Sequence, residues 1–253
     1  MQVSEKINTE LQISISHAVT RAAHGLTLVE KRIVGLFIAK FDNSKYKKSL
    51  GRVIGPQDSM IRITAKEYSK TFNIPINDVY RGLLKGSNKL FGRYWRVILE
   101  TPKGKKEFKY NWLEGVVYHH GEGWVEATFG QRTIPHLVFN LKDKYTKYKL
   151  KSTIALTSSY AWRFWELLAQ FANTKRPANE ERLVRISLEQ FRYAMDVPKS
   201  YKYKDIRVRI IQPSIEQILN LNKIDVTWKA IKKSRSVTSL DFTYTPYDQL
   251  KLF

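Results

Sequence analysis

Basic side chains gather near the start of one predicted helix, at Lys202, Lys204, Arg207 and Arg209. Lysine neutralises phosphate, and arginine can in addition pair with the two hydrogen-bond acceptors on the major-groove edge of guanine. A helix carries a partial positive charge at its N-terminal end, so cations are disfavoured there unless an anion lies nearby. The position of these side chains therefore predicts an anionic partner.

The helix that would carry them runs from Tyr203 to Leu219. Its apolar residues recur at steps of three and four, which gives one face for packing against a core: Ile206, Ile210, Ile211, Ile215, Ile218 and Leu219. Pro213 cannot donate a hydrogen bond to the carbonyl of Arg209 and crowds it. The helix is therefore expected to kink or split at this proline.

A second basic cluster, Lys232, Lys233 and Arg235, lies in the turn between two alternating apolar stretches. That alternation predicts a β-hairpin, whose tip would grip DNA backbone beside the helix. Plainer interpretations stay open at several of these positions. The hairpin tip could be a solvated turn, and Asp205 and Arg209 could form a surface ion pair four residues apart. Val208 could border the core or contact a thymine methyl group.

The charge of the whole chain supports a polyanionic partner. Its 253 residues include 44 Lys+Arg against 23 Asp+Glu, a formal net charge of +21. Nucleic acid is the default partner for such a field. An anionic membrane surface is the alternative, but the sequence shows no amphipathic helix with a continuous basic face. Ten basic and only three acidic residues lie between Lys199 and Arg235.

The sequence offers little for catalysis, and we expect no enzyme activity, no cofactor and no metal. Without cysteine, thiolate catalysis and cysteine-ligated zinc are excluded, and a reducing cytoplasm is the expected compartment. Adjacent strand residues point to opposite faces, so His119 and His120 cannot chelate one metal as a His-x-His pair does in rolling-circle nicking initiators. No phosphate-binding Gly-x4-Gly-Lys-Ser/Thr motif occurs, and no stretch is long enough to span a membrane.

Fifteen residues, Ile61–Pro75, align without gaps on Val184–Pro198, at an offset of 123. Each copy has a short β-type run, a capping box (Thr64 with Glu67, Ser187 with Gln190) and a short helix that stops at a proline. A longer helix precedes each copy, over Leu26–Phe41 and Leu156–Phe171, and another helix and alternating strands follow. We interpret this as an internal duplication.

Helix, short strand, two helices and a hairpin is the order of a winged helix-turn-helix. The chain is therefore predicted to be an α+β protein with two tandem winged-helix domains, residues 1–150 and 151–253, that join near Tyr145–Leu156. In each domain the third helix is the recognition helix, which enters the major groove with its N-terminal residues, and the hairpin is the wing.

The first domain has a weaker basic pattern. Its third helix, predicted over Asn77–Phe91, places Asn77, Arg81 and Lys85 on one face, and Gly82 and Gly86 are expected to loosen it. The hairpin at Lys103, Lys105 and Lys106 is the predicted wing, and the strands around His119 and His120 are an additional pair. Lys45–Arg52 is either a phosphate contact or a soluble loop.

Several stretches resemble the RepB/RepE-type replication initiators of iteron-containing plasmids. The resemblance covers nearly the whole chain and is carried by Leu26–Lys40, by Ile134–Leu150 with Ser158–Phe171, and by Val197–Ile210 with the Lys-Lys-Ser-Arg run before the last strand. Tyr160 to Leu167 carries its most specific pattern, Tyr-Ala-x-Arg-x-aromatic-Glu-Leu. Two departures are Ser234, often a glycine in the family, and Val208, frequently an arginine; both bear on sequence preference.

The resemblance implies a function and partners. The second domain would be the main binder of repeated double-stranded DNA sites, with contacts at the basic residues of its recognition helix and wing. The first would support DNA contact and dimerisation. Monomers would bind the origin repeats and recruit the host initiator and replicative helicase, while dimers would repress the initiator's own promoter. A dimeric repressor without a replication role would show the same residue pattern.

Overall fold

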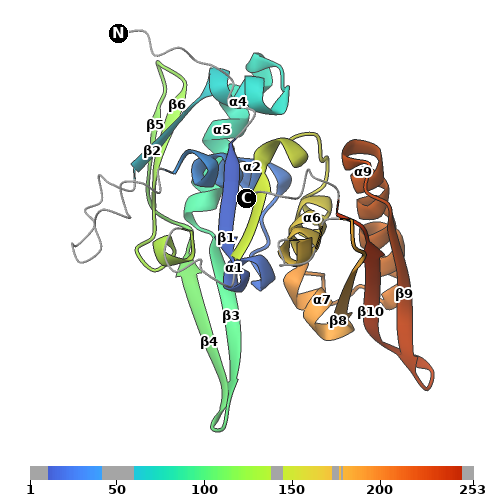
Figure 1. Cartoon of the computed structure of the whole chain (residues 1–253). Coiled ribbons are helices and arrows are strands. Elements are labelled where there is room, and N and C mark those ends of the chain that lie inside the picture. Colours follow the sequence, from blue (N-terminus) through green and yellow to red (C-terminus); the bar gives the residue numbers. More distant parts are fainter. Residues whose placement is uncertain (1–10, 42–59, 138–144, 173–176, 178, 247–253) are drawn as a thin grey trace.

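The structure is a computed structural model that describes residues 11–41, 60–137, 145–172, 177 and 179–246 (Figure 1). The Lys45–Arg52 segment lies outside these residues. The first half contains β1 (Gln12–Ser16), α1 (His17–Arg21), α2 (Leu28–Lys40), β2 (Met60–Thr64), α4 (Ala65–Phe72), α5 (Ile76–Phe91), β3 (Tyr94–Thr101), β4 (Gly104–Asn111), β5 (Leu113–His119), β6 (Trp124–Phe129), a 3-10 turn (Ile134–His136) and β7 (Tyr145–Lys149).

The second half begins after a short 3-10 turn, Leu150–Ser152. It contains α6 (Ser159–Ala172), β8 (Arg182–Ser187), α7 (Leu188–Ala194), α8 (Tyr203–Ile206), a π-helical segment (Arg207–Ile211), α9 (Gln212–Asn222), β9 (Val226–Lys233) and β10 (Ser236–Tyr244). Each half has a three-stranded antiparallel sheet of the same order, β2-β6-β5 and β8-β10-β9. The predicted tandem winged-helix architecture is therefore present.

The wing of the first half is a different hairpin from the one predicted. In the second half β10 pairs with the short strand β8 that precedes the helix-turn-helix. Its counterpart in the first half is β6, which pairs with β2 from Met60↔Thr128 to Thr64↔Trp124. The wing is therefore β5–β6, and β3–β4, with Lys103, Lys105 and Lys106, is the additional pair. Both hairpins alternate in hydropathy, and only the long-range pairing with β2 separates them.

The repeated unit also repeats its backbone geometry. Thr64 and Ser187 each accept a hydrogen bond from the amide three residues on, at 3.1 Å in both copies. The return bond of the predicted capping boxes, from the side chain of Glu67 or Gln190 to the backbone of the capping residue, is not formed. A complete capping box is formed at Thr27 and Glu30 of α2. Asn73 and Asp196, which are 123 residues apart, both adopt positive φ (52° and 50°) after their short helices. Asparagine and aspartate tolerate this left-handed conformation better than most residues.

Helix α6 lies between the two halves (Figure 1) and eleven of its fourteen residues are buried. It packs against α1 and β7 of the first half and against α9 and β8 of the second. Tyr244 of β10 donates a hydrogen bond to the Leu168 carbonyl (2.5 Å), and Arg21 of α1 donates one to Gln170 (3.2 Å). One helix therefore supplies core to both halves.

A buried ion pair fixes the first-half side of α6. Lys31 Nζ of α2 lies 2.8 Å from both carboxylate oxygens of Glu166, and the two side chains are 5% and 2% exposed. Tyr148 of β7 donates to the same carboxylate at 2.6 Å and accepts from the Trp162 indole at 2.9 Å. Burial and the neighbouring carboxylate raise the pKa of Tyr148 well above its ordinary value. The phenol is thus fixed as a neutral donor.

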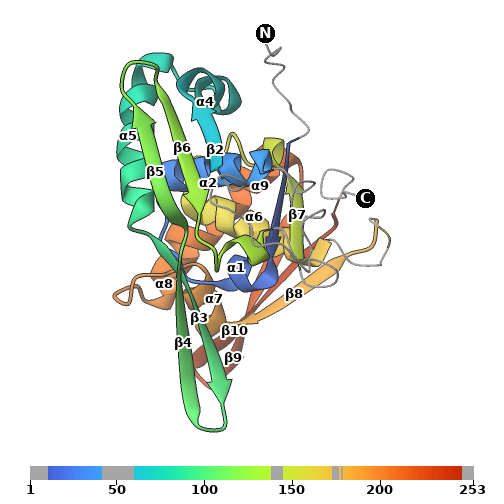
Figure 2. The same cartoon turned by 90° about the vertical axis from the view of Figure 1, so that its left-hand side faces the viewer.

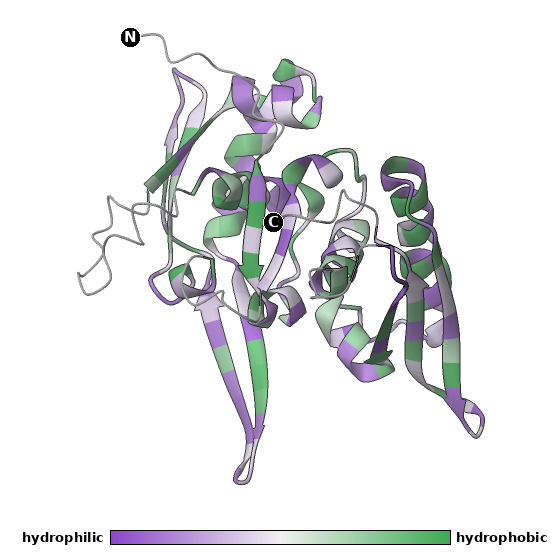
Figure 3. Ribbon diagram, viewed as in Figure 1, coloured by the Kyte–Doolittle hydropathy of each residue, from purple (hydrophilic) through white to green (hydrophobic). Residues whose placement is uncertain are grey.

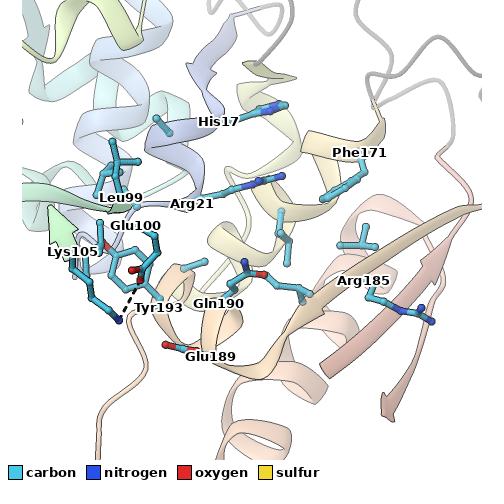
Figure 4. Close-up of a pocket in the computed structure, with 18 residues that line it drawn as sticks. His17, Arg21, Leu99, Glu100, Lys105, Phe171, Arg185, Glu189, Gln190 and Tyr193 are labelled. Carbon is cyan, nitrogen blue, oxygen red and sulfur yellow. Dashed lines mark ion pairs between the residues drawn. The ribbon is translucent and has the colours of Figure 1, made fainter. Parts of the chain in front are cut away.

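A cleft of about 660 Å³ lies between the halves where α6 does not fill the space (Figure 4). Val97, Ile98 and Leu99 of β3 line one side, and Val184 and Ile186 of β8 line the other. Tyr193 of α7 bridges the two sides by donating to the Arg96 carbonyl at 2.6 Å. The β3–β4 hairpin thus contacts the second half through Arg96, near the start of β3. Beyond this contact, β3 and β8 line opposite sides of the cleft.

Gly86 has a packing role rather than the loosening role that its type suggested. A Cβ there would lie 2.7 Å from Ile33 Cδ1 and 2.8 Å from Val29 Cγ1, so its absence lets α5 approach α2. Nothing lies within 4 Å of a Cβ built on Gly82.

These two glycines of one helix therefore give opposite predictions. We expect Gly86→Ala to lower the free energy of unfolding by about 1–3 kcal/mol because it overpacks the α2–α5 contact. Gly82→Ala should raise it by up to about 1 kcal/mol, since alanine favours the helix. Urea denaturation of both variants measures this, and a loss of stability in both or in neither would contradict the packing role.

His24 is buried and neutral. Arg163 donates from Nη1 to its Nε2 and from Nη2 to the Ala22 carbonyl at 2.6 Å. A guanidinium only donates, so Nε2 carries no proton. Burial, with the charges of Arg163 and Lys31, lowers the pKa of His24 well below 6.5.

The lowered pKa predicts a loss of stability in acid. Below about pH 6.5 the unfolded chain binds a proton at His24 that the folded chain does not, so the free energy of unfolding falls by up to about 1.4 kcal/mol per pH unit. His24→Gln, whose amide oxygen still accepts from Arg163, should flatten the profile between pH 6.5 and pH 5. The exposed control His120→Gln should follow the natural chain, and identical slopes in all three would contradict a neutral His24.

Candidate nucleic-acid interface

The recognition helix of the second half is continuous from Tyr203 to Asn222, so it does not split at Pro213, although its backbone is irregular just before this proline. The turn before the proline widens instead: Arg207–Ile211 is π-helical, and the Gln212 amide donates to the Arg207 carbonyl five residues back. Pro213 cannot donate to the carbonyl four residues back and crowds it, and the wider turn before it leaves the helix continuous. Ile206, Ile210, Ile211 and Ile218 are buried as predicted, whereas Leu219 is 42% exposed.

The predicted basic residues of this helix point to solvent. Lys202, Lys204, Arg207 and Arg209 are all exposed, opposite the buried isoleucines. Lys204 and Arg207 form no ion pair with any residue in the described part of the chain. Val208 between the arginines is 46% exposed, so it is not a core residue. The solvent face of the helix is therefore cationic in its N-terminal half, with Val208 between the two arginines.

Arg209 contacts two neighbouring side chains and remains exposed to solvent. Its Nε lies 3.4 Å from Asp205 Oδ1, so the ion pair predicted from the four-residue spacing forms. Its guanidinium carbon lies 5.4 Å from the centre of the Tyr201 ring. The side chain is nevertheless 62% exposed.

Arg192 holds the turn that leads into the recognition helix, and sequence reasoning missed it. From α7 its guanidinium donates to the carbonyls of Tyr201, Pro198 and Lys199 at 2.9, 3.1 and 3.4 Å. The position 123 residues earlier is Ser69, whose hydroxyl donates to the Ile74 carbonyl in the shorter turn of the first half. The internal repeat could have identified Arg192, because it aligns this residue with Ser69. The turn after Arg192 is longer, so a longer side chain is needed to reach its carbonyls.

The wing of the second half carries its basic residues at its tip. Lys232 and Lys233 end β9, and Lys233 pairs with Ser236 across a two-residue turn, Ser234-Arg235. All three basic residues are exposed, and Figure 3 shows hydrophobic residues giving way to hydrophilic ones toward the tip. Ser234 has φ of 55°, a conformation that favours glycine, which explains why a glycine suits this position.

The first half presents a second recognition helix, α5. Asn77, Arg81 and Lys85 are exposed on it, as predicted, and Val79, Leu83 and Leu90 are buried on its other face. Figure 2 shows α5 and α8 along the same, left-hand side of the molecule. The two helices α5 and α8 thus lie on one side of the molecule, and each has exposed cations.

The paired histidines have separate surroundings. His119, the last residue of β5, stacks on Trp124 with 5.0 Å between the ring centres and accepts a hydrogen bond from the Glu122 amide. His120 contacts Tyr118 edge-on, with 5.1 Å between the ring centres. Within the described ranges no three His, Cys, Asp or Glu side chains gather as metal ligands do. No helix in this part of the chain has the length and apolar character that a bilayer crossing requires.

Two family descriptions match the chain in succession. "Initiator Replication protein, WH1" matches residues 12–169, and "Initiator Rep protein, WH2" matches residues 187–244. The chain belongs to the initiator replication protein family. The first match extends through most of α6, the helix that packs against both halves, and the two matches together confirm the resemblance found in the sequence.

A solved structure shows the same fold, and one further protein is similar in sequence. The structure of this initiator is similar to that of the Pi initiator protein, solved in complex with iteron DNA, with a TM-score of 0.74 at 18% identity over 95% of this chain and 99% of that one. The sequence is 21% identical over 170 residues to an uncharacterised 27.6 kDa protein of Escherichia coli, covering 66% of this chain and 70% of that protein.

Proposed function

We propose that this chain initiates plasmid replication by binding directly repeated sites in double-stranded origin DNA as a monomer. One observation carries the proposal: α5 and the start of the second recognition helix, α8, lie on the same side of a single chain, and both helices have exposed cations. A helix fits the major groove, and a chain with two such helices suits a repeat without palindromic symmetry. The structure of the Pi initiator protein with iteron DNA supports this reading.

The two halves have different roles in this proposal. Residues 151–253 supply the main contacts through Lys202, Lys204, Arg207 and Arg209 and through the wing residues Lys232, Lys233 and Arg235. Residues 1–150 supply auxiliary contacts through Asn77, Arg81 and Lys85 and the surface for self-association. The homodimer represses the chain's own promoter, and the DNA-bound monomer recruits the host initiator and the replicative helicase in the cytoplasm.

The chain acts in this proposal by binding, without a catalytic step or cofactor of its own. A repressor without a replication role would use the same contacts, but the match of both family descriptions favours the initiator. A rolling-circle nicking enzyme would need a metal-binding histidine pair. The separate contacts of the His119 and His120 rings give no support to such a site.

Arg207 and the wing lysines should have different effects on binding. A duplex selected from a random library by the full-length chain serves as the specific site, and a random duplex of equal length as the reference. Arg207→Ala should weaken specific binding by about 1–3 kcal/mol and random binding much less, as loss of a bidentate base contact does. Lys232→Ala with Lys233→Ala should weaken both alike and flatten the log–log salt slope by roughly 1–2.

The salt titrations of both variants distinguish the two roles. Equal losses on the two duplexes for Arg207→Ala would contradict base reading by this arginine. An unchanged salt slope for the lysine variant would remove the wing from the interface.

A further inference from the structure

The contacts of Arg209 involve Nε and the face of its guanidinium, and they leave the terminal nitrogens free to bind a partner. Asp205 engages Nε, at 3.4 Å, and the Tyr201 ring lies against the guanidinium at 5.4 Å from its centre. No described residue accepts a hydrogen bond from the terminal nitrogens Nη1 and Nη2. These two nitrogens form the fork that can donate two parallel hydrogen bonds to O6 and N7 of guanine.

Both groups that contact Arg209 are themselves held in place. The Tyr201 carbonyl accepts from Arg192, the guanidinium that closes the turn before the helix. Asp205 uses its second oxygen, Oδ2, to accept from the Lys202 amide at 3.0 Å. Tyr201 is thus tied to α7 and Asp205 to the first turn of α8. The first attachment holds the Tyr201 backbone and the second is the capping contact of α8, so both contacts of Arg209 come from fixed positions.

We propose that Tyr201 and Asp205 are positioning residues that orient Arg209 for contact with a guanine in the DNA site. The inference rests on the proposed function, because it requires this helix to enter the major groove. A side chain already restrained in its binding geometry loses less conformational freedom on binding. The ring and the carboxylate therefore favour the sequence that has a guanine opposite Arg209, without touching DNA themselves.

The test is a double-mutant cycle on the full-length chain, with the selected duplex and a random duplex as probes. Tyr201→Leu should weaken specific binding about two- to fivefold, the effect expected from losing an exposed cation–π contact. Random binding and the salt slope should stay unchanged, because the charge of Arg209 remains. Tyr201→Phe keeps the ring and should bind like the natural chain.

The cycle identifies the residue through which Tyr201 acts. Tyr201→Leu should have no further effect on specific binding once Arg209 is alanine. In the matched Arg207→Ala background it should retain its full effect, because the ring does not contact Arg207. Equal losses on both duplexes, or an undiminished effect in the Arg209→Ala background, would overturn the proposal.

Tyr201 is half-buried, so Asp205→Asn provides a second route if Tyr201→Leu lowers the melting temperature. Asparagine keeps an acceptor for the Lys202 amide but removes the charge beside Nε. A loss of specific binding that vanishes in the Arg209→Ala background supports the proposal, and an additive loss overturns it. Failure to select any sequence with the natural chain would instead refute the proposed function.

Discussion

The contact of Lys31 with Glu166 determines how the two halves of this initiator are joined. A buried charge without a partner is strongly destabilising. Because Lys31 and Glu166 are both buried, α2 and α6 must stay in contact for the two charges to remain paired. Tyr148 of β7 donates to the same carboxylate, and α6 also packs on α9, which continues the recognition helix. The position of the second recognition helix relative to the first therefore depends on one shared core helix.

The two winged-helix units differ in the turn that leads into each recognition helix. Three residues separate the helices in the first unit, from Asn73 to Pro75, whereas eight separate them in the second, from Met195 to Lys202. The longer turn brings Tyr201 beside the recognition helix and requires Arg192 to hold it. The first unit closes its turn with Ser69 alone, and its helix is fixed instead by the close approach at Gly86. The same fold thus provides one elaborated and one simple recognition helix.

Sequence periodicity predicted what depends on neighbouring residues. The recognition helices, their buried faces and the tip of the second wing follow from spacing alone, as does the pairing of Asp205 with Arg209. Periodicity could not choose which first-half hairpin joins β2, because β3–β4 and β5–β6 alternate equally well. Nor could it pair Lys31 with Glu166, which are 135 residues apart. Periodicity also did not predict the π-helical turn at Arg207–Ile211, because a proline in a sequence normally indicates that a helix kinks or ends.

In the proposed function, one chain presents two recognition helices to one duplex. Successive major grooves on one face of DNA lie about 34–36 Å apart, so a monomer that uses both helices covers roughly 20 base pairs. Hydroxyl-radical footprinting on the selected duplex, with the mass of the complex measured in parallel, tests this directly. We predict that one chain protects two successive grooves of a non-palindromic site. Protection of one groove only, or two chains on every minimal site, would contradict the account.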